Sequence, residues 1–179
     1  MRLLLRLCRF IDTLNDRLAV LAKWAVLASC VISAGNAAVR YVFSVSSNAY
    51  LEIQWYLFAA CVMLGASQVL RVNEHVRVDL IYGRWSGRTQ AHIDLFGLIV
   101  FLLPVCAAML WFSAPLFWQM LQSGEMSNNA GGLIRWPAML CLPLGFGLLF
   151  LQGLSEIVKR VAWLRGLFEG DFHYEAPLQ

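Results

Sequence analysis

The chain has 179 residues, of which 60% are hydrophobic and only 14% are charged, and its formal net charge is +3 at pH 7. An average soluble domain is about one quarter charged, so this chain has too few charged side chains to cover a water-soluble globule. It is also too apolar for an intrinsically disordered protein. The small positive charge indicates orientation against a membrane rather than binding to nucleic acid.

The first 17 residues have the pattern of an amphipathic helix. Apolar side chains recur every three or four residues, with arginines between them: Leu3, Leu7, Phe10, Leu14 and Leu18. A helix of this kind lies on a membrane surface, so we expect an amphipathic arm over residues 1–17 on the inner face of the membrane. Two alternatives are an ordinary cytoplasmic lead-in to the first span and a signal peptide cleaved near residues 34–37.

Charge-free runs predict four transmembrane helices, near residues 20–43, 50–70, 93–121 and 135–157. A spanning helix needs about 20 apolar residues, so the short first run depends on Lys23 and Arg40 extending their head groups to the interfaces. The third run is long, and Pro104 and Pro115 are expected to kink it. The predicted fold class is an all-α integral membrane protein, a single domain over residues 1–179 with four transmembrane helices and the N-terminal amphipathic surface helix.

The basic residues predict the orientation of these spans. All of them fall on the side that holds both termini, except Arg40 and Arg135. Basic residues in short connections stay on the cytoplasmic side, so both termini and the tail, residues 158–179, are predicted to be cytoplasmic. Five of the inner cations are candidates to hold lipid headgroups, the alternative being that they only orient the chain: Arg77, Arg84, Arg88, Lys159 and Arg160.

Two charged residues flank the first outer turn. Arg40 ends the first predicted span, Glu52 begins the second, and 11 residues separate them. We expect the two side chains to meet near the outer interface and to clasp the first hairpin, because pairing lowers the cost of a charge at membrane depth. The alternatives are contact with a partner subunit and a role for Glu52 as a proton-coupling carboxylate.

The residues that most cofactor and metal sites need are missing from the spans. His75, His92 and His173 lie outside the spans or at an edge, which argues against a haem-binding anchor. The five cysteines are scattered without a C-x-x-C spacing, so neither a zinc site nor a disulfide framework is predicted. We predict no catalytic residue, no metal and no cofactor. A polar site at the membrane midplane, which secondary transporters usually have, is not evident either.

Several short motifs occur in a characteristic order. Arg-Tyr-Val-Phe at 40–43 closes the first span, Glu52 opens the second, and His75 and Asp79 follow it; Gly-Gly-Leu-Ile-Arg-Trp-Pro at 131–137 leads into the last span. In this order the motifs resemble the small membrane subunit of TRAP transporters, the DctQ-like family. The resemblance covers about residues 18 to 160.

The resemblance implies a function. TRAP systems are tripartite, sodium-coupled carriers of organic acids such as carboxylates in the bacterial inner membrane. A periplasmic protein captures the substrate, a large membrane subunit moves it by an elevator motion, and the small subunit extends the static scaffold without a substrate site of its own. The implied partners are the large subunit, the periplasmic protein and membrane lipids. The alternative is a stand-alone four-helix exporter that uses Glu52 for proton coupling.

Two groups of residues are candidates for contacts. A hairpin clasp or subunit interface would use Arg40, Glu52, His75 and Asp79. The outer loops face the side of the periplasmic protein, so their polar residues are candidates for docking it: Glu125, Asn128 and Arg135.

Overall fold

The chain forms long helices joined by short loops. The computed structural model describes residues 2–45, 47–73, 82 and 85–167. The helices are α1 (Arg2–Phe43), α2 (Asn48–Val72), α4 (Gly87–Gly97), the π-helix η1 (Leu98–Leu102), α5 (Leu103–Ser123) and α6 (Trp136–Leu164). Because α4, η1 and α5 run on as one rod, four helical segments are long and apolar enough to cross a membrane. The predicted four-span, all-α membrane fold is confirmed.

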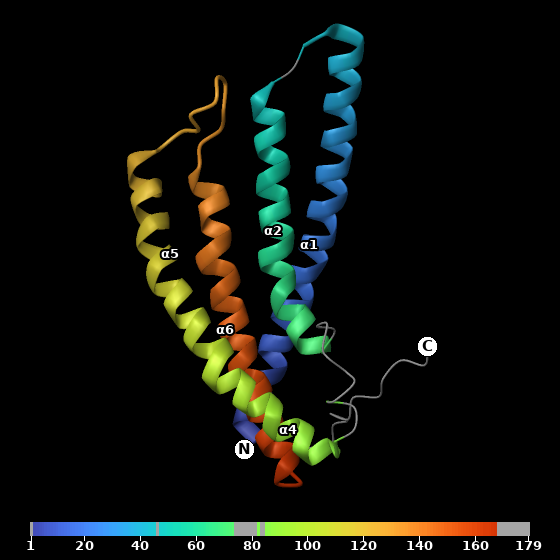
Figure 1. The fold of residues 1–179 in the computed structure, drawn as a ribbon, viewed down its shortest axis with the longest axis vertical. Helices are drawn as coiled ribbons and strands as arrows, with labels where there is room; N and C mark the ends of the chain where they lie inside the picture. Colours follow the sequence, from blue (N-terminus) through green and yellow to red (C-terminus); the bar gives the residue numbers. More distant parts are fainter. Residues whose placement is uncertain (1, 46, 74–81, 83–84, 168–179) are drawn as a thin grey trace.

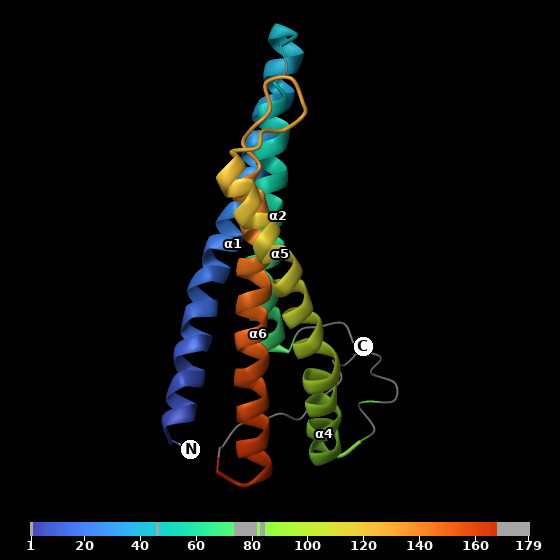
Figure 2. The ribbon, with the colours of Figure 1, turned by 90° about the vertical axis from the view of Figure 1, so that its left-hand side faces the viewer.

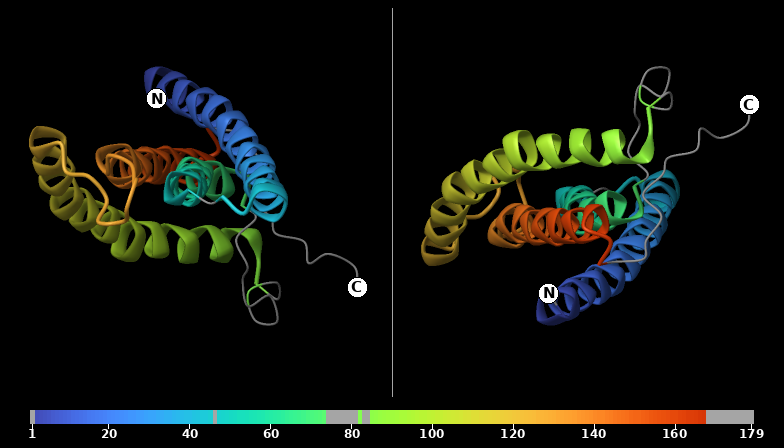
Figure 3. Two further views of the ribbon diagram at one scale, coloured as in Figure 1. Left: turned by 90° about the horizontal axis from the view of Figure 1, so that it is seen from above. Right: turned by 90° about the horizontal axis from the view of Figure 1, so that it is seen from below.

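The four helical segments stand side by side rather than around a closed core. In the upper half of Figure 1 their order is α5, α6, α2, α1. Helix α6 packs against α1, α2 and α5, and α1 also packs along α2. Seen from above, α2 and α6 lie between α1 and the curved α4–α5 rod (Figure 3). The end that carries the 124–135 loop is called the outer end below, and the opposite end is the inner end.

The N-terminal arm predicted over residues 1–17 continues directly into the first span. It is the first part of α1, a single helix of 42 residues that is about 63 Å long at 1.5 Å per residue (Figure 2). Cys8, Asn15 and Ala19 on this part are buried, and the side chain of Asn15 bonds α6. No helix-breaking residue separates the arm from the span, and Asp12 and Asn15 of the arm have partners on α6. The arm and the first span are therefore one continuous helix, and contact of the arm with the membrane surface stays a prediction.

A widened turn marks the middle of the long rod. The N–H of Leu103 bonds the carbonyl of Leu98, five residues back, where an α-helix would bond four residues back. Pro104 follows directly; its ring crowds the carbonyl four residues earlier and it has no N–H to donate, and a π-turn relieves that conflict. The kink expected at Pro104 thus takes the form of this π-turn in a curved rod (Figure 3).

Glycines on α6 allow close approach of the neighbouring helices. A Cβ atom on Gly145 would lie 2.6 Å from the Met63 Cβ atom and 2.9 Å from its carbonyl oxygen. A Cβ atom on Gly153 would lie 2.6 Å from the Leu102 Cδ2 atom of η1. Small residues at such contacts let helix backbones approach each other in membranes. The two glycines therefore set the distances from α6 to α2 and to the rod.

Polar side chains gather in two layers that are one bilayer core apart. On α2, Glu52 and Arg71 are 19 residues apart, about 28 Å along the helix axis, and the hydrocarbon core of a bilayer is about 30 Å thick. On α6, every residue from 137 to 151 is apolar, and Gln152 is the first polar one. The two layers therefore correspond to the two membrane interfaces.

Candidate functional site

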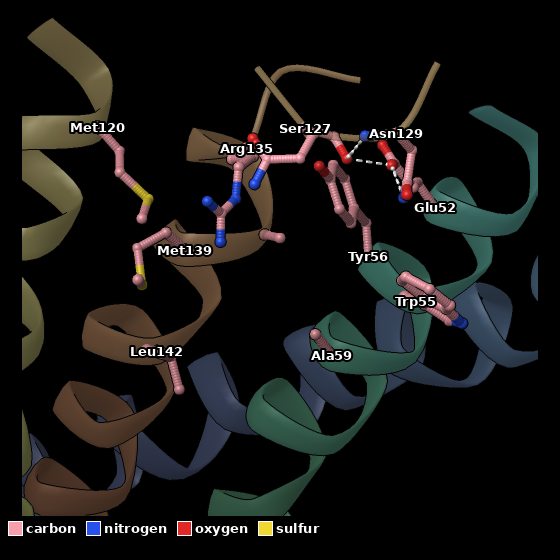
Figure 4. A pocket seen from close by; sticks show the side chains of 12 residues that line it. Glu52, Trp55, Tyr56, Ala59, Met120, Ser127, Asn129, Arg135, Met139 and Leu142 are labelled. Atoms are coloured by element: carbon pink, nitrogen blue, oxygen red, sulfur yellow. Dashed lines mark hydrogen bonds between the residues drawn. The ribbon is translucent and has the colours of Figure 1, made fainter. Parts of the chain in front are cut away.

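The outer layer is organised around Glu52, which lies in the first turns of α2. Its side chain is buried at 3% exposure. Its carboxylate accepts hydrogen bonds from the Ser127 hydroxyl, from the Asn129 amide at 2.8 Å and from the main-chain N–H of Leu133 at 2.6 Å. Figure 4 shows the bonds from Ser127 and Asn129. Glu52 thus attaches the first hairpin to the loop between α5 and α6.

The loop that binds Glu52 is itself well defined. An isolated antiparallel bridge joins Met126 to Ile134, and an ion pair joins Glu125 to Arg135. A Cβ atom on Gly132 would lie 2.8 Å from the Glu52 Oε1 atom. Position 132 therefore suits only glycine, because a side chain there would displace either Ser127 of the loop or the Glu52 carboxylate.

The predicted clasp between Arg40 and Glu52 does not form. Glu52 points toward the outer loop, and Arg40 is exposed on α1, with no ion pair in the part of the chain that the structure describes. The physical reason is that three donors of the loop, including the Leu133 N–H, already bind the carboxylate of Glu52. The other two residues of this predicted group, His75 and Asp79, lie outside the described residues.

A pocket of about 480 Å³ lies beneath the loop, between α2 and α6 (Figure 4). Its lining includes Glu52, Trp55, Tyr56, Met120, Arg135 and Met139. The carboxylate of Glu52 is bonded to the loop and the guanidinium of Arg135 is paired with Glu125, so both charges already have partners. The pocket suits an apolar group better than an organic acid.

The three residues predicted for periplasmic docking are all exposed on this loop: Glu125, Asn128 and Arg135.

The inner layer is a buried hydrogen-bond network centred on Gln152 of α6. Its amide oxygen accepts from the Asn15 amide at 2.6 Å, and its amide nitrogen donates to Asp12 at 2.9 Å and to Glu156 at 3.0 Å. The Ser67 hydroxyl of α2 donates to Asn15 at 3.0 Å. Gln152, Asn15 and Ser67 are all 0% exposed. The network therefore fastens α1 and α2 to α6.

Charged side chains extend this layer to the rod. Lys159 lies 3.1 Å from Asp12, and it also pairs with Glu156. Arg160 bonds Glu156 at 2.6 Å and Asp94 of α4 at 3.1 Å. Buried charges of this kind need partners, and here each cation faces two carboxylates. The inner ends of all four helical segments are thereby joined.

This network corrects the prediction that Lys159 and Arg160 hold lipid headgroups. The side chains of these residues are 12% and 4% exposed, and both are paired inside the protein. Arg88 is exposed on α4 and fits the prediction by its position. Arg77 and Arg84 lie outside the described residues.

Sequence reasoning missed the inner layer. A signal was present, because Gln152, Glu156 and Arg160 recur every four residues on one face of the last helix. Asp12 and Asn15 of the N-terminal arm carry no such signal, because their spacing does not show that they bond Gln152 of α6. Within the described part of the chain, no three His, Cys, Asp or Glu side chains are placed to hold a metal ion.

Comparison with known proteins identifies the family. The family described as "Tripartite ATP-independent periplasmic transporters, DctQ component" has a model that matches residues 29–162. No curated protein matches the chain, and no solved structure does. The family match covers more than half of the chain and includes α2, the rod, the outer loop and most of α6. The chain therefore belongs to the DctQ family, the small membrane component of TRAP transporters.

Proposed function

We propose that this chain is the small scaffold subunit of a sodium-coupled TRAP transporter for organic acids such as carboxylates. In this proposal it lies in the bacterial inner membrane with both termini in the cytoplasm, and it braces the large subunit without catalysing a reaction or binding the substrate. A periplasmic binding protein delivers the substrate to the outer face, where the exposed residues of the 124–135 loop are placed to contact it.

The observation that carries this proposal is the separation of the two polar layers. A solute or ion site in a secondary transporter lies near the bilayer midplane and needs polar groups there. From 137 to 151, α6 is entirely apolar, and from 103 to 118 the only polar residue of α5 is Ser113. The polar side chains of α6 lie instead in its inner part, where Gln152 and Lys159 bond α1 and Arg160 bonds α4. This distribution suits a rigid brace.

Fastening at both ends also supports a static role. Glu52 joins the two hairpins at the outer end, and Gln152 joins α1, α2 and α6 at the inner end. In an elevator mechanism one domain slides while another stays fixed, so the fixed part benefits from helices that resist sliding against each other. The small residues of α2 contribute within the subunit: a Cβ atom on Gly65 would lie 4.0 Å from the Ala22 Cβ atom of α1.

Copurification tests this proposal. The tagged chain, extracted from its native membranes in mild detergent, is expected to bring down one much larger polytopic membrane protein in a fixed ratio. A matched control is a tagged, unrelated four-span protein expressed at the same level. Isolation of the chain alone, under conditions that keep other membrane complexes intact, would overturn the proposal.

A further inference from the structure

A polar groove lies between α1 and α2 near the outer end, and the functions above do not use it. Its volume is about 520 Å³. We call it the outer groove. Seven residues line it: Ser33, Asn36, Ala37, Arg40, Tyr41, Leu51 and Gln54. On α1, Ser33, Ala37 and Arg40 are three and four residues apart, so they form one stripe along the helix. The groove thus follows the seam of the first hairpin.

Hydrogen-bond donors in the outer groove lack acceptors. The side-chain nitrogen of Gln54 is buried without a hydrogen-bond partner. Among the residues that the structure describes, none forms an ion pair with the guanidinium of Arg40, because Glu52 is turned toward the outer loop. No acidic residue is among those that line the groove. The groove therefore presents the positive charge of Arg40 to whatever covers it, and the Gln54 amide in its lining has an unpaired nitrogen.

The depth of the groove distinguishes a protein from a lipid as its occupant. Ser33 is seven residues before Arg40, about 10 Å deeper along α1. A lipid phosphate at the interface can reach Arg40 in the last turn of the helix, but acyl chains next to Ser33 and Asn36 offer no hydrogen bonds. Polar groups at such depth normally face another protein segment that supplies partners.

We propose that the outer groove is the docking site for a transmembrane helix of the large subunit, which sets a carboxylate against Arg40 and an oxygen acceptor against Gln54. This inference rests on the proposed function, because it names the surface through which the small subunit holds its partner. The complementarity is one of charge: a cation with no internal counter-ion matches an acidic side chain. The exposed apolar side chains of Tyr41, Val42 and Phe43 next to Arg40 supply the apolar rim of the contact.

Site-specific photocrosslinking tests the location. A benzophenone amino acid is placed at Ala37, in the groove, and in a matched variant at Trp111, a 78% exposed position on α5. In the purified complex, irradiation is expected to yield a product of both subunits from position 37 and none from position 111. Crosslinking to the large subunit from position 111 and not from 37 would overturn the inference, as would a product at 37 that contains only lipid.

Charge variants test the chemistry. Arg40→Glu is expected to lower the amount of copurified large subunit more than tenfold, since breaking a desolvated charge pair costs more than one factor of ten in affinity; Arg40→Lys should retain most of it. Arg17→Glu is the control, an exposed arginine on the inner part of the same helix, and membrane levels and thermal unfolding of each variant check folding. Full copurification with Arg40→Glu would refute the inference while leaving the proposed function intact. Failure of the unmodified chain to bring down the large subunit would refute the proposed function itself.

Discussion

The carboxylate of Glu52 on α2 accepts a hydrogen bond of 2.6 Å from the main-chain N–H of Leu133, two residues before the ion-paired Arg135 that precedes α6. Together with the bonds from Ser127 and Asn129, this bond links the two helical hairpins at the outer end. The family motif that places a glutamate at the start of the second span therefore acts within the subunit here, as a connection from α2 to the loop.

Replacing Glu52 is expected to release the outer loop. Glu52→Ala removes the acceptor of three hydrogen bonds, so the melting temperature in detergent should fall. A reporter cysteine at Asn128 should then react faster with a water-soluble maleimide. Glu52→Gln keeps one side-chain oxygen as an acceptor and should give a smaller change. The control is Gln122→Ala, at an exposed position of α5 just before the loop; if it has an effect equal to that of Glu52→Ala, the loop is not anchored by Glu52.

A matched pair of glycines tests the packing of α6. Gly145→Ala places a methyl group 2.6 Å from the Met63 Cβ atom, whereas Gly147→Ala places one at an ordinary distance of 3.7 Å from Leu110. Overpacking of this kind costs about 1–3 kcal/mol, so Gly145→Ala should lower the stability measured by denaturant or heat, and Gly147→Ala should leave it unchanged or slightly raised. Equal stability of the two variants would show that α2 and α6 are not in close contact at Gly145.

The inner layer should respond strongly to loss of its central amide. Gln152→Leu leaves Asn15, Asp12 and Glu156 each without a bond that they now make. Asp12 and Glu156 keep their pairs with Lys159 and Arg160, but the buried Asn15 amide nitrogen loses its acceptor. A buried group left unsatisfied costs about 1–3 kcal/mol, so the free energy of unfolding should fall by about that amount.

Gln119→Leu is the control for this substitution, because it makes the same change at an exposed position of α5. Thermal unfolding of the purified protein compares the two. A Gln152→Leu protein that unfolds at the same temperature as the Gln119→Leu protein would mean that the network does not stabilise the fold.

Cysteine labelling in intact cells tests the orientation. In a background from which the five free cysteines have been removed, a cysteine at Asn128 should be labelled by a reagent that stays outside the inner membrane. A cysteine at Arg165, exposed just after α6, should be labelled only after the cells are opened. Labelling in the opposite order would reverse the assignment of the outer and inner ends.

The spans could be predicted from sequence because burial in lipid requires long apolar runs, and such runs depend only on local composition. The helix itself continues past the predicted span: α6 runs to Leu164, and in this part Gln152 bonds α1 and Arg160 bonds α4. A polar stretch that continues a helix cannot be distinguished from a tail without knowledge of those partners.

The pairing of charged residues could not be predicted in the same way. Arg40 and Glu52 lie on either side of the turn between the first two spans, so an ion pair between them was the simplest expectation. The structure pairs Glu52 with a loop about 80 residues further along the chain, and this choice depends on the arrangement of the two hairpins. Likewise, the position of Lys159 and Arg160 at a predicted membrane interface suggested lipid contacts, whereas the acids that neutralise them come from α1, α4 and α6.

Solute uptake into proteoliposomes tests the central claim most directly. Vesicles are prepared with this chain alone, with the large subunit alone, and with both, and the binding protein loaded with its organic acid is added under an inward sodium gradient. The account predicts uptake with both subunits together and none with this chain alone. Two results would contradict this prediction. One is uptake by vesicles that contain only this chain, and the other is uptake by vesicles with the large subunit alone that equals the uptake with both subunits.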